Sequence, residues 1–296
     1  MIEQALYDHL KAQKELMPFL ATYAKKPAVF SQEAPPDNDK NWDPGPQYGR
    51  IVFSVDIKGD PARTAGGTLM VDILCQKGQE TPGYPEDIEP IIRKLIHGWF
   101  FSSGTFAVAA QWSTSDPFTE PQKQVIGCTV SFDLLAFPVL TTTGLDVVAR
   151  LNEWTSQIEG LHVINYDKLP SDAWKPGPGE SAIYWRRLRD GPSSLIRDRY
   201  AMIGRTATIK GHIFAEDIAA ASAVANDLTI RLYTAKRLLK PPESPIMVDE
   251  RITQDDGADP LRTGQLTVEA TYCIMRYTQT DKVINDIKKS ERKETL

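Results

Sequence analysis

The chain has 296 residues, of which 41% are hydrophobic and 25% are charged, values typical of a globular protein. The net charge of −5 is unevenly placed, because residues 1–144 contain 12 Lys or Arg against 17 Asp or Glu, whereas residues 145–296 contain 22 of each. This acidity argues against a general nucleic-acid binder, and no apolar run approaches the roughly 18 residues that span a bilayer.

The N-terminal segment has none of the charged, apolar and small-residue regions of a signal peptide. The three cysteines, Cys75, Cys128 and Cys273, are odd in number, well separated, and each lies in an apolar run typical of a strand. We therefore expect buried free thiols in a reducing compartment rather than disulfides or a metal site.

The first half alternates helix and strand signals. Apolar residues recur at helical spacing over the first turns, at Ile2, Leu6, Leu10, Leu16 and Met17, and Pro18 limits this helix. The segments expected next are a short strand at 28–30, a proline-rich loop at 31–47, strands at 51–57 and 67–75 joined by a turn at 58–61, a helix from Pro85 to about Trp99, and strands at 106–112 and 125–132.

The second half repeats this order. A helical stripe is formed by Val147, Val148, Leu151, Trp154 and Ile158. The segments expected after it are a short strand at 162–164, a strand at 183–185, a turn at 190–192, a strand at 205–214, a helix from Glu216, and strands at 246–248 and 266–274.

One short motif occurs twice. Residues 42–46 read W-D-P-G-P, and residues 174–178, which lie 132 positions later, read W-K-P-G-P. A pattern of one rare residue with three backbone-breaking residues seldom recurs by chance, so we predict an internal repeat. The predicted fold class is α+β, with two similar domains at 1–143 and 144–280, each a mostly antiparallel sheet covered by helices, and a charged tail at 281–296.

This order of elements resembles the tail-completion and tail-terminator proteins of tailed bacteriophages. The resemblance is carried by Val29-Phe30 before Pro35-Pro36, by the strand at 51–57, by the strand at 68–75 running into the helix at Glu86, and by the last strand at 125–132. It covers most of each half, and the chain departs from the usual family member in being doubled.

The resemblance implies a structural virion protein with no catalytic residues, cofactor or metal, assembled in the host bacterial cytoplasm. Its partners would be further copies of itself in a ring, the tail tube protein and the head–tail connector, with genomic DNA passing nearby and no membrane contact. Ring proteins associate head to tail, so a doubled chain fits a trimer with pseudo-six-fold symmetry or a hexamer.

The candidate subunit-interface residues are two tryptophans and five arginines. Trp42 and Trp174 lie in proline-rich loops expected at the surface. They would anchor a neighbouring subunit, as Trp often does, or fold back over their own sheet edge. The arginines form a dense run: Arg186, Arg187, Arg189, Arg197 and Arg199. Ion pairs with acidic faces of adjacent subunits, or a solvated strand face, are favoured over DNA phosphate contacts.

No motif predicts enzyme chemistry. The histidines, His9, His97, His162 and His212, have no ligand partner at metal-binding spacing. The segment at 177–181 lacks the spacing of a phosphate-binding loop, and the paired carboxylates Asp37/Asp39 and Asp255/Asp256 are interpreted as solvated turns. Two alternatives stay open: a tail tube or baseplate component, and a two-domain ligand-binding protein or enzyme with its site between the halves.

Overall fold

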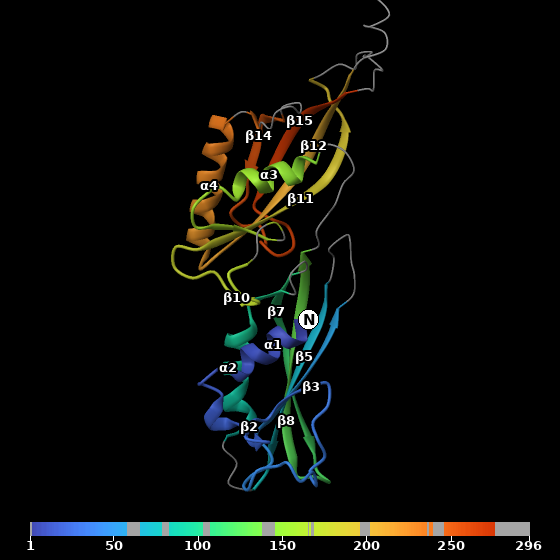
Figure 1. Cartoon of the computed structure of the whole chain (residues 1–296), viewed down its shortest axis with the longest axis vertical. Helices are drawn as coiled ribbons and strands as arrows, with labels where there is room; N and C mark the ends of the chain where they lie inside the picture. The colour runs from blue at the N-terminus through green and yellow to red at the C-terminus, as the bar shows by residue number, and fades with distance from the viewer. Residues whose placement is uncertain are drawn as a thin grey trace, which may run out of the picture.

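The computed structural model describes residues 2–57, 66–78, 83–102, 107–137, 146–164, 166, 169–195, 202–235, 237–238 and 246–275. The turn expected at 58–61, Arg197, Arg199 and the tail at 281–296 lie outside these residues. Within them the fold is mixed α+β, as predicted, with two large sheets of mixed orientation. Figure 1 shows an elongated molecule in which the two sheets follow one another along the long axis.

The elements of the first half are α1 (Ile2–Lys11), a 3₁₀ turn η1 (Met17–Phe19), β1 (Thr22–Tyr23), β2 (Lys26–Pro27), β3 (Val29–Ser31), β4 (Arg50–Ile57), β5 (Gly67–Gln76), α2 (Pro85–Ile96), β6 (Phe100–Ser102), β7 (Ala107–Glu120) and β8 (Val125–Phe137). Those of the second half are α3 (Val147–Thr155), β9 (Leu161–Val163), β10 (Ala173–Trp174), β11 (Ser181–Pro192), β12 (Met202–Ala215), α4 (Ile218–Ala235), β13 (Arg237–Leu238), β14 (Ile246–Gln254) and β15 (Leu266–Met275).

The two sheets have corresponding strand orders. The first sheet runs β10-β6-β7-β8-β5-β4-β3, and the second runs β13-β14-β15-β12-β11-β9. In each sheet the short strand after the first helix pairs parallel with its neighbour, β3 with β4 and β9 with β11, and the other pairs are antiparallel. Apart from β10, each strand of the first sheet has a counterpart at the same place in the second.

Each sheet buries one face beneath its helices. Alternate residues of β5 and β8, such as Val71 and Val130, share a core with Leu6 of α1 and Ile92 of α2. In the second half, alternate residues of β12 and β15 share a core with α3 and α4. Because side chains alternate between the two faces of a strand, the residues between these core positions lie on the opposite face, which we call the open face of each sheet.

At corresponding positions, the cores of the two halves pack residues of different size. Phe53 of β4 pairs with Val71 of β5, and at the corresponding place Trp185 of β11 pairs with Gly211 of β12. A Cβ on Gly211 would lie 2.7 Å from the Trp185 ring, so the larger ring requires the smaller partner. Interiors pack to near-crystal density, which explains why the two residues differ together.

The halves meet at a junction of aromatic side chains from both open faces. Its buried residues are Phe100, Ala107, Ala109, Phe137, Ile164, Trp174, Ala182, Tyr184 and Phe214. The ring centroids of Phe137 lie 5.1 Å from Tyr184 and 5.5 Å from Phe214. The second half also adds β10 to the first sheet, antiparallel to β6, so backbone hydrogen bonds as well as packing join the halves.

Most expected elements are confirmed, with differences at their ends. α1 stops at Lys11 rather than Pro18, because the Gln13 side-chain amide donates to the His9 carbonyl (3.0 Å), which a continuing helix would bond through a backbone N–H. β7 continues past the expected end at 112 and includes Pro117. Because β6 pairs only with the start of β7, Pro117 lies on a free strand edge, where a missing N–H is tolerated.

The turn expected at 190–192 is wrong. These residues are the last of β11, with Gly191 opposite Thr206 and Pro192 opposite Arg205. Five short strands, β1, β2, β6, β10 and β13, were not expected. Each is so short that no periodic pattern develops, and β10 exists only because the two halves are in contact.

Candidate functional site

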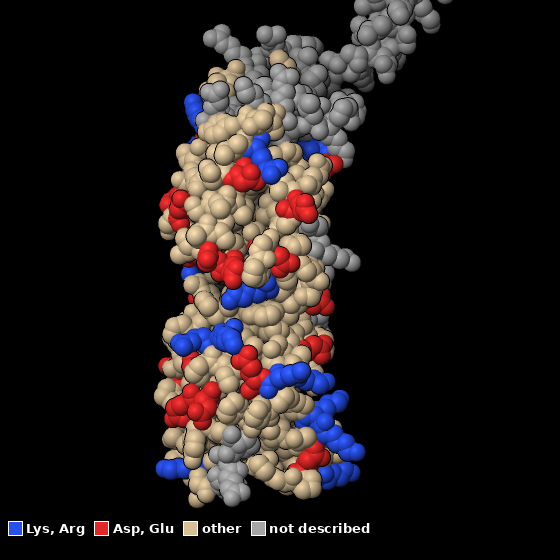
Figure 2. Space-filling view, turned by 90° about the vertical axis from the view of Figure 1, so that its left-hand side faces the viewer, with Lys and Arg blue, Asp and Glu red and all other residues tan. Residues whose placement is uncertain are grey.

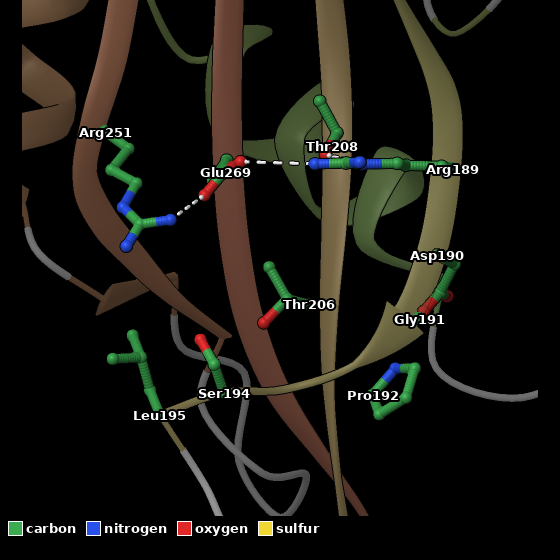
Figure 3. A pocket seen from close by; sticks show the side chains of 10 residues that line it. All are labelled: Arg189, Asp190, Gly191, Pro192, Ser194, Leu195, Thr206, Thr208, Arg251 and Glu269. Atoms are coloured by element: carbon green, nitrogen blue, oxygen red, sulfur yellow. Dashed lines mark hydrogen bonds and ion pairs between the residues drawn. The ribbon is translucent and has the colours of Figure 1, made fainter.

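An arginine-rich hollow lies at the end of the second sheet away from the junction. Its cavity measures about 290 Å³ and is lined by Arg189, Asp190, Gly191, Pro192, Ser194, Leu195, Thr206, Thr208, Arg251 and Glu269. Figure 3 shows that most of these residues come from β11, β12, β15 and β14, which lie side by side in the sheet, and that Ser194 and Leu195 come from the segment after β11.

A β-bulge places Arg189 in this hollow. The pairing of β11 with β12 shifts between Arg187 and Arg189, and Leu188 between them is exposed. Without the shift, Arg189 would share the helix-covered face with Trp185. The bulge moves it to the open face, opposite Thr208, and bulges commonly re-aim a side chain in this way.

Arg189 belongs to a row of side chains that crosses four strands. Its Nε donates to Thr208 Oγ1 (3.0 Å), and its guanidinium lies 3.7 Å from Glu269, which also pairs with Arg251 at 3.3 Å (Figure 3). Glu269 is mostly buried, whereas the Arg189 and Arg251 side chains are 77% and 69% exposed. The row therefore presents two cations to solvent over one covered carboxylate.

A second ion-pair network surrounds Asp190. Its carboxylate contacts Arg205 at 3.0 Å and Arg187 at 3.6 Å, and it accepts a short hydrogen bond from the Tyr272 hydroxyl. Burial and this hydrogen bond raise the pKa of Tyr272 to about 12. Desolvation acts to lower the pKa of Arg205, but the nearby Asp190 carboxylate outweighs it and raises the pKa. The Asp190 network lies on the helix-covered face, because Arg187 is opposite Ile209 and Arg205 is opposite Tyr272.

On the open face, the hollow holds two guanidinium groups, Arg189 and Arg251, against the one carboxylate of Glu269. The surplus positive charge, with hydroxyl donors from Ser194 and Thr206 nearby, suits a negatively charged group such as a carboxylate or phosphate. Leu195 contributes an apolar wall and is 61% exposed. Arginine beside exposed apolar side chains is typical of protein–protein contacts.

The sequence pointed to three described residues of this arginine run. Arg187 and Arg189 belong to the two networks, and their carboxylate partners, Asp190 and Glu269, lie in the same half rather than in the acidic first half. Arg186 is half-buried on the open face, opposite Lys210. The sequence did not indicate Arg205, Arg251 or Glu269, which come from strands distant in the chain.

Both tryptophans are buried, and Trp42 folds back beside β3 at the edge of its own sheet, which is one of the two possibilities that the sequence left open. Trp42 is 8% exposed and packs against Tyr23 and Phe30, and its indole N–H donates to the Pro36 carbonyl at 3.0 Å. Trp174 is 6% exposed and lies in the junction beside Phe100. The repeated motif thus serves two different environments. Their assignment to subunit contacts stays a prediction.

The three cysteines and two of the histidines lie in the protein core or at its edge. Cys75 and Cys128 are buried free thiols, as expected, and burial raises the pKa of Cys75 to about 12; Cys273 is half-buried. His9 is buried with its Nε2 at 2.9 Å from the Leu95 carbonyl oxygen, and desolvation lowers its pKa. His212 lies 2.8 Å from the Pro260 carbonyl oxygen.

Comparisons with known proteins give no match, whether with protein-family models, with curated proteins or with solved structures. Among the described residues, no three His, Cys, Asp or Glu side chains are grouped to hold a metal ion. In the same part of the chain, no helix combines the length and apolar character needed to cross a membrane.

Proposed function

We propose that the chain is a structural protein of a phage tail or phage-like particle, which forms a ring on the tail tube and joins it to the head-proximal connector. Its two halves would be diverged copies of one domain, with boundaries near 143 and 280. The protein would be assembled in the bacterial cytoplasm and reside in the neck of the virion. It would act through its surfaces rather than through catalysis.

The corresponding strand orders carry this proposal. Six strands occur in the same order in both sheets, with a helix before the first strand and another after the third. This agreement adds to the repeated W-x-P-G-P motif, which rests on sequence alone. A doubled domain has two similar but unequal surfaces, and such surfaces suit head-to-tail association that closes into a ring.

The alternatives have less support. A ligand site between the halves is disfavoured because the described part of the junction is filled by packed aromatic rings. The arginine-rich hollow lies at the other end of the second sheet. A tail tube or baseplate role shares the requirement for self-association and differs only in the position within the particle.

The first experiment measures the mass of the purified protein by light scattering across a concentration range, with negative-stain images of the same samples. We expect a trimer or hexamer with ring-shaped particles, either alone or after addition of purified tail tubes. A protein that stays monomeric at high concentration and leaves tube ends unchanged would contradict the proposal. The number of subunits per ring, three or six, would decide between the two stoichiometries.

A further inference from the structure

The open face of the first sheet is acidic. Four aspartates lie on it, one from each of its long strands: Asp56, Asp72, Asp116 and Asp133. Arg50 is the single Lys or Arg in these four strands, and it is buried against the proline-rich loop. Away from the junction, this face therefore presents negative charge.

The open face of the second sheet has the opposite sign. Its described charged side chains are four cations and one carboxylate: Arg186, Arg189, Lys210, Arg251 and Glu269. The carboxylate is held between Arg189 and Arg251. Positive charge therefore prevails on this face. Among its ion-paired side chains, Arg189 and Arg251 are far more exposed than Glu269.

The two open faces carry charges of opposite sign at one pair of corresponding positions. In the first sheet, Asp56 lies opposite Thr68, which lies opposite Asp133. The same row of the second sheet is Arg189, Thr208 and Glu269. The outer position is thus an aspartate in one sheet and an arginine in the other. The bulge in β11 causes this difference in charge, because it brings Arg189 rather than Leu188 onto the open face.

The helix-covered side does not show this separation. Figure 2 views the side that bears α2 and α4, where acidic and basic groups are interspersed over the described part of the surface. Segregation of charge is therefore a property of the open faces. Separated charges of this kind steer association and select partners.

The chain already makes this kind of contact internally. Arg262, from the loop before β15, lies 3.1 Å from Asp133 and donates to Gln111 Oε1 at 2.9 Å, both on the open face of the first sheet. A cation of the second half thus binds the acidic open face of the first half beside the junction. Asp56, Asp72 and Asp116 extend this acidic face beyond that contact.

We propose that the basic open face of one copy, centred on Arg189 and Lys210, docks on the acidic open face of the first half of a second copy. This inference rests on the proposed self-assembly and names the surfaces that would form it. The two surfaces differ, so the contact is head to tail and each copy uses both. Contact between faces of opposite charge weakens as salt screens them.

The experiment uses two charge-reversed forms of the full chain. One carries Arg189→Glu and Lys210→Glu, and the other carries Asp56→Lys and Asp72→Lys. Each form alone places like charges at the contact, and we expect its dissociation constant to rise about 30-fold or more. An equimolar mixture restores opposite charges at every contact between the two forms. We therefore expect association to recover in sedimentation velocity at low salt, at all contacts of an alternating hexamer and at two of the three contacts of a trimer.

The controls separate charge from folding. Arg231→Glu on α4 and Asp8→Lys on α1 reverse exposed charges on the helical side and should leave association unchanged. Arg189→Gln with Lys210→Gln tests the basic face without repulsion from Glu269, and thermal melting of every variant reports its stability. A variant pair that folds but does not associate on mixing, while the unaltered protein does, would overturn the inference.

Failure of this contact is distinguishable from failure of the proposed function. If both reversed forms still build rings alone, the docking surfaces are wrong and the ring proposal stands. If the unaltered protein never associates and does not join tail tubes, both are wrong. Association that 0.5 M NaCl leaves unchanged would also contradict a contact between charged faces, because the screening length falls to roughly a few ångströms at such salt.

Discussion

Arg50 holds the long proline-rich loop of the first half against its sheet. Its guanidinium lies 4.1 Å from the Tyr48 ring centroid and 4.8 Å from that of Trp42, and it forms an ion pair with Asp37. Because a planar guanidinium can stack on rings and bind a carboxylate at once, one residue fixes both flanks of the loop. The sequence shows these residue types but not their convergence.

At this residue scale, the pH dependence of stability is predictable. Burial alone would raise the pKa of Asp37, but hydrogen bonds from Arg50 and Tyr48 outweigh it and hold the pKa below its ordinary value of 3.8. A carboxyl with a lowered folded pKa stabilises the protein above pH 3.8, and this stabilisation is lost as the pH falls through the folded pKa.

Asp37→Asn should therefore flatten the decline of stability below pH 4, as measured by urea unfolding at pH 7, 4 and 3. Tyr48→Phe, which removes one of the two stabilising hydrogen bonds, should give an intermediate slope. Equal slopes for all three proteins would show that Asp37 does not contribute to acid unfolding.

The buried tryptophans make a second prediction at this scale. Because Trp174 packs against Phe100 in the junction, Trp174→Ala should lower the free energy of unfolding by about 3–5 kcal/mol. Chemical denaturation of the variant beside Trp112→Ala, which removes a partly exposed ring, measures the difference. A small loss of stability with a large loss of assembly would instead support the subunit-anchor interpretation.

At the scale of elements, neighbouring strands of the two sheets compensate for one another's side-chain volumes. Gly211→Ala should destabilise the protein by about 1–3 kcal/mol, because its Cβ would meet the Trp185 ring. Adding Trp185→Phe should recover part of this loss, since it recreates the smaller ring that Phe53 provides in the first sheet. Urea unfolding of the two single variants and the double variant tests this coupling, and strictly additive losses would contradict it.

The whole molecule should unfold as one unit. The aromatic junction and the β10–β6 pairing tie the halves together, and a large apolar interface makes separate domain unfolding unfavourable. We expect a single calorimetric transition for the unaltered protein. Phe137→Asp, which places a charge among packed rings, should split it into two; two transitions in the unaltered protein would show that the junction is weak.

The sequence determined the fold class and the order of the main strands and helices, because these depend on local periodicity and on turns marked by Gly and Pro. The internal repeat that the sequence suggests stays a prediction. Strands such as β5 and β8 alternate apolar and other residues clearly enough to be located, and the burial of Cys75 and Cys128 followed from the same pattern.

Only the tertiary structure decided where the repeated tryptophans point, which carboxylates the arginines meet, and which charges share a face. Trp174 is buried because the other half covers it, and Arg189 reaches the open face because a bulge shifts its strand by one residue. Such placements depend on contacts between residues far apart in the chain. A one-residue change of register moves a side chain to the other face, and local sequence patterns do not specify either effect.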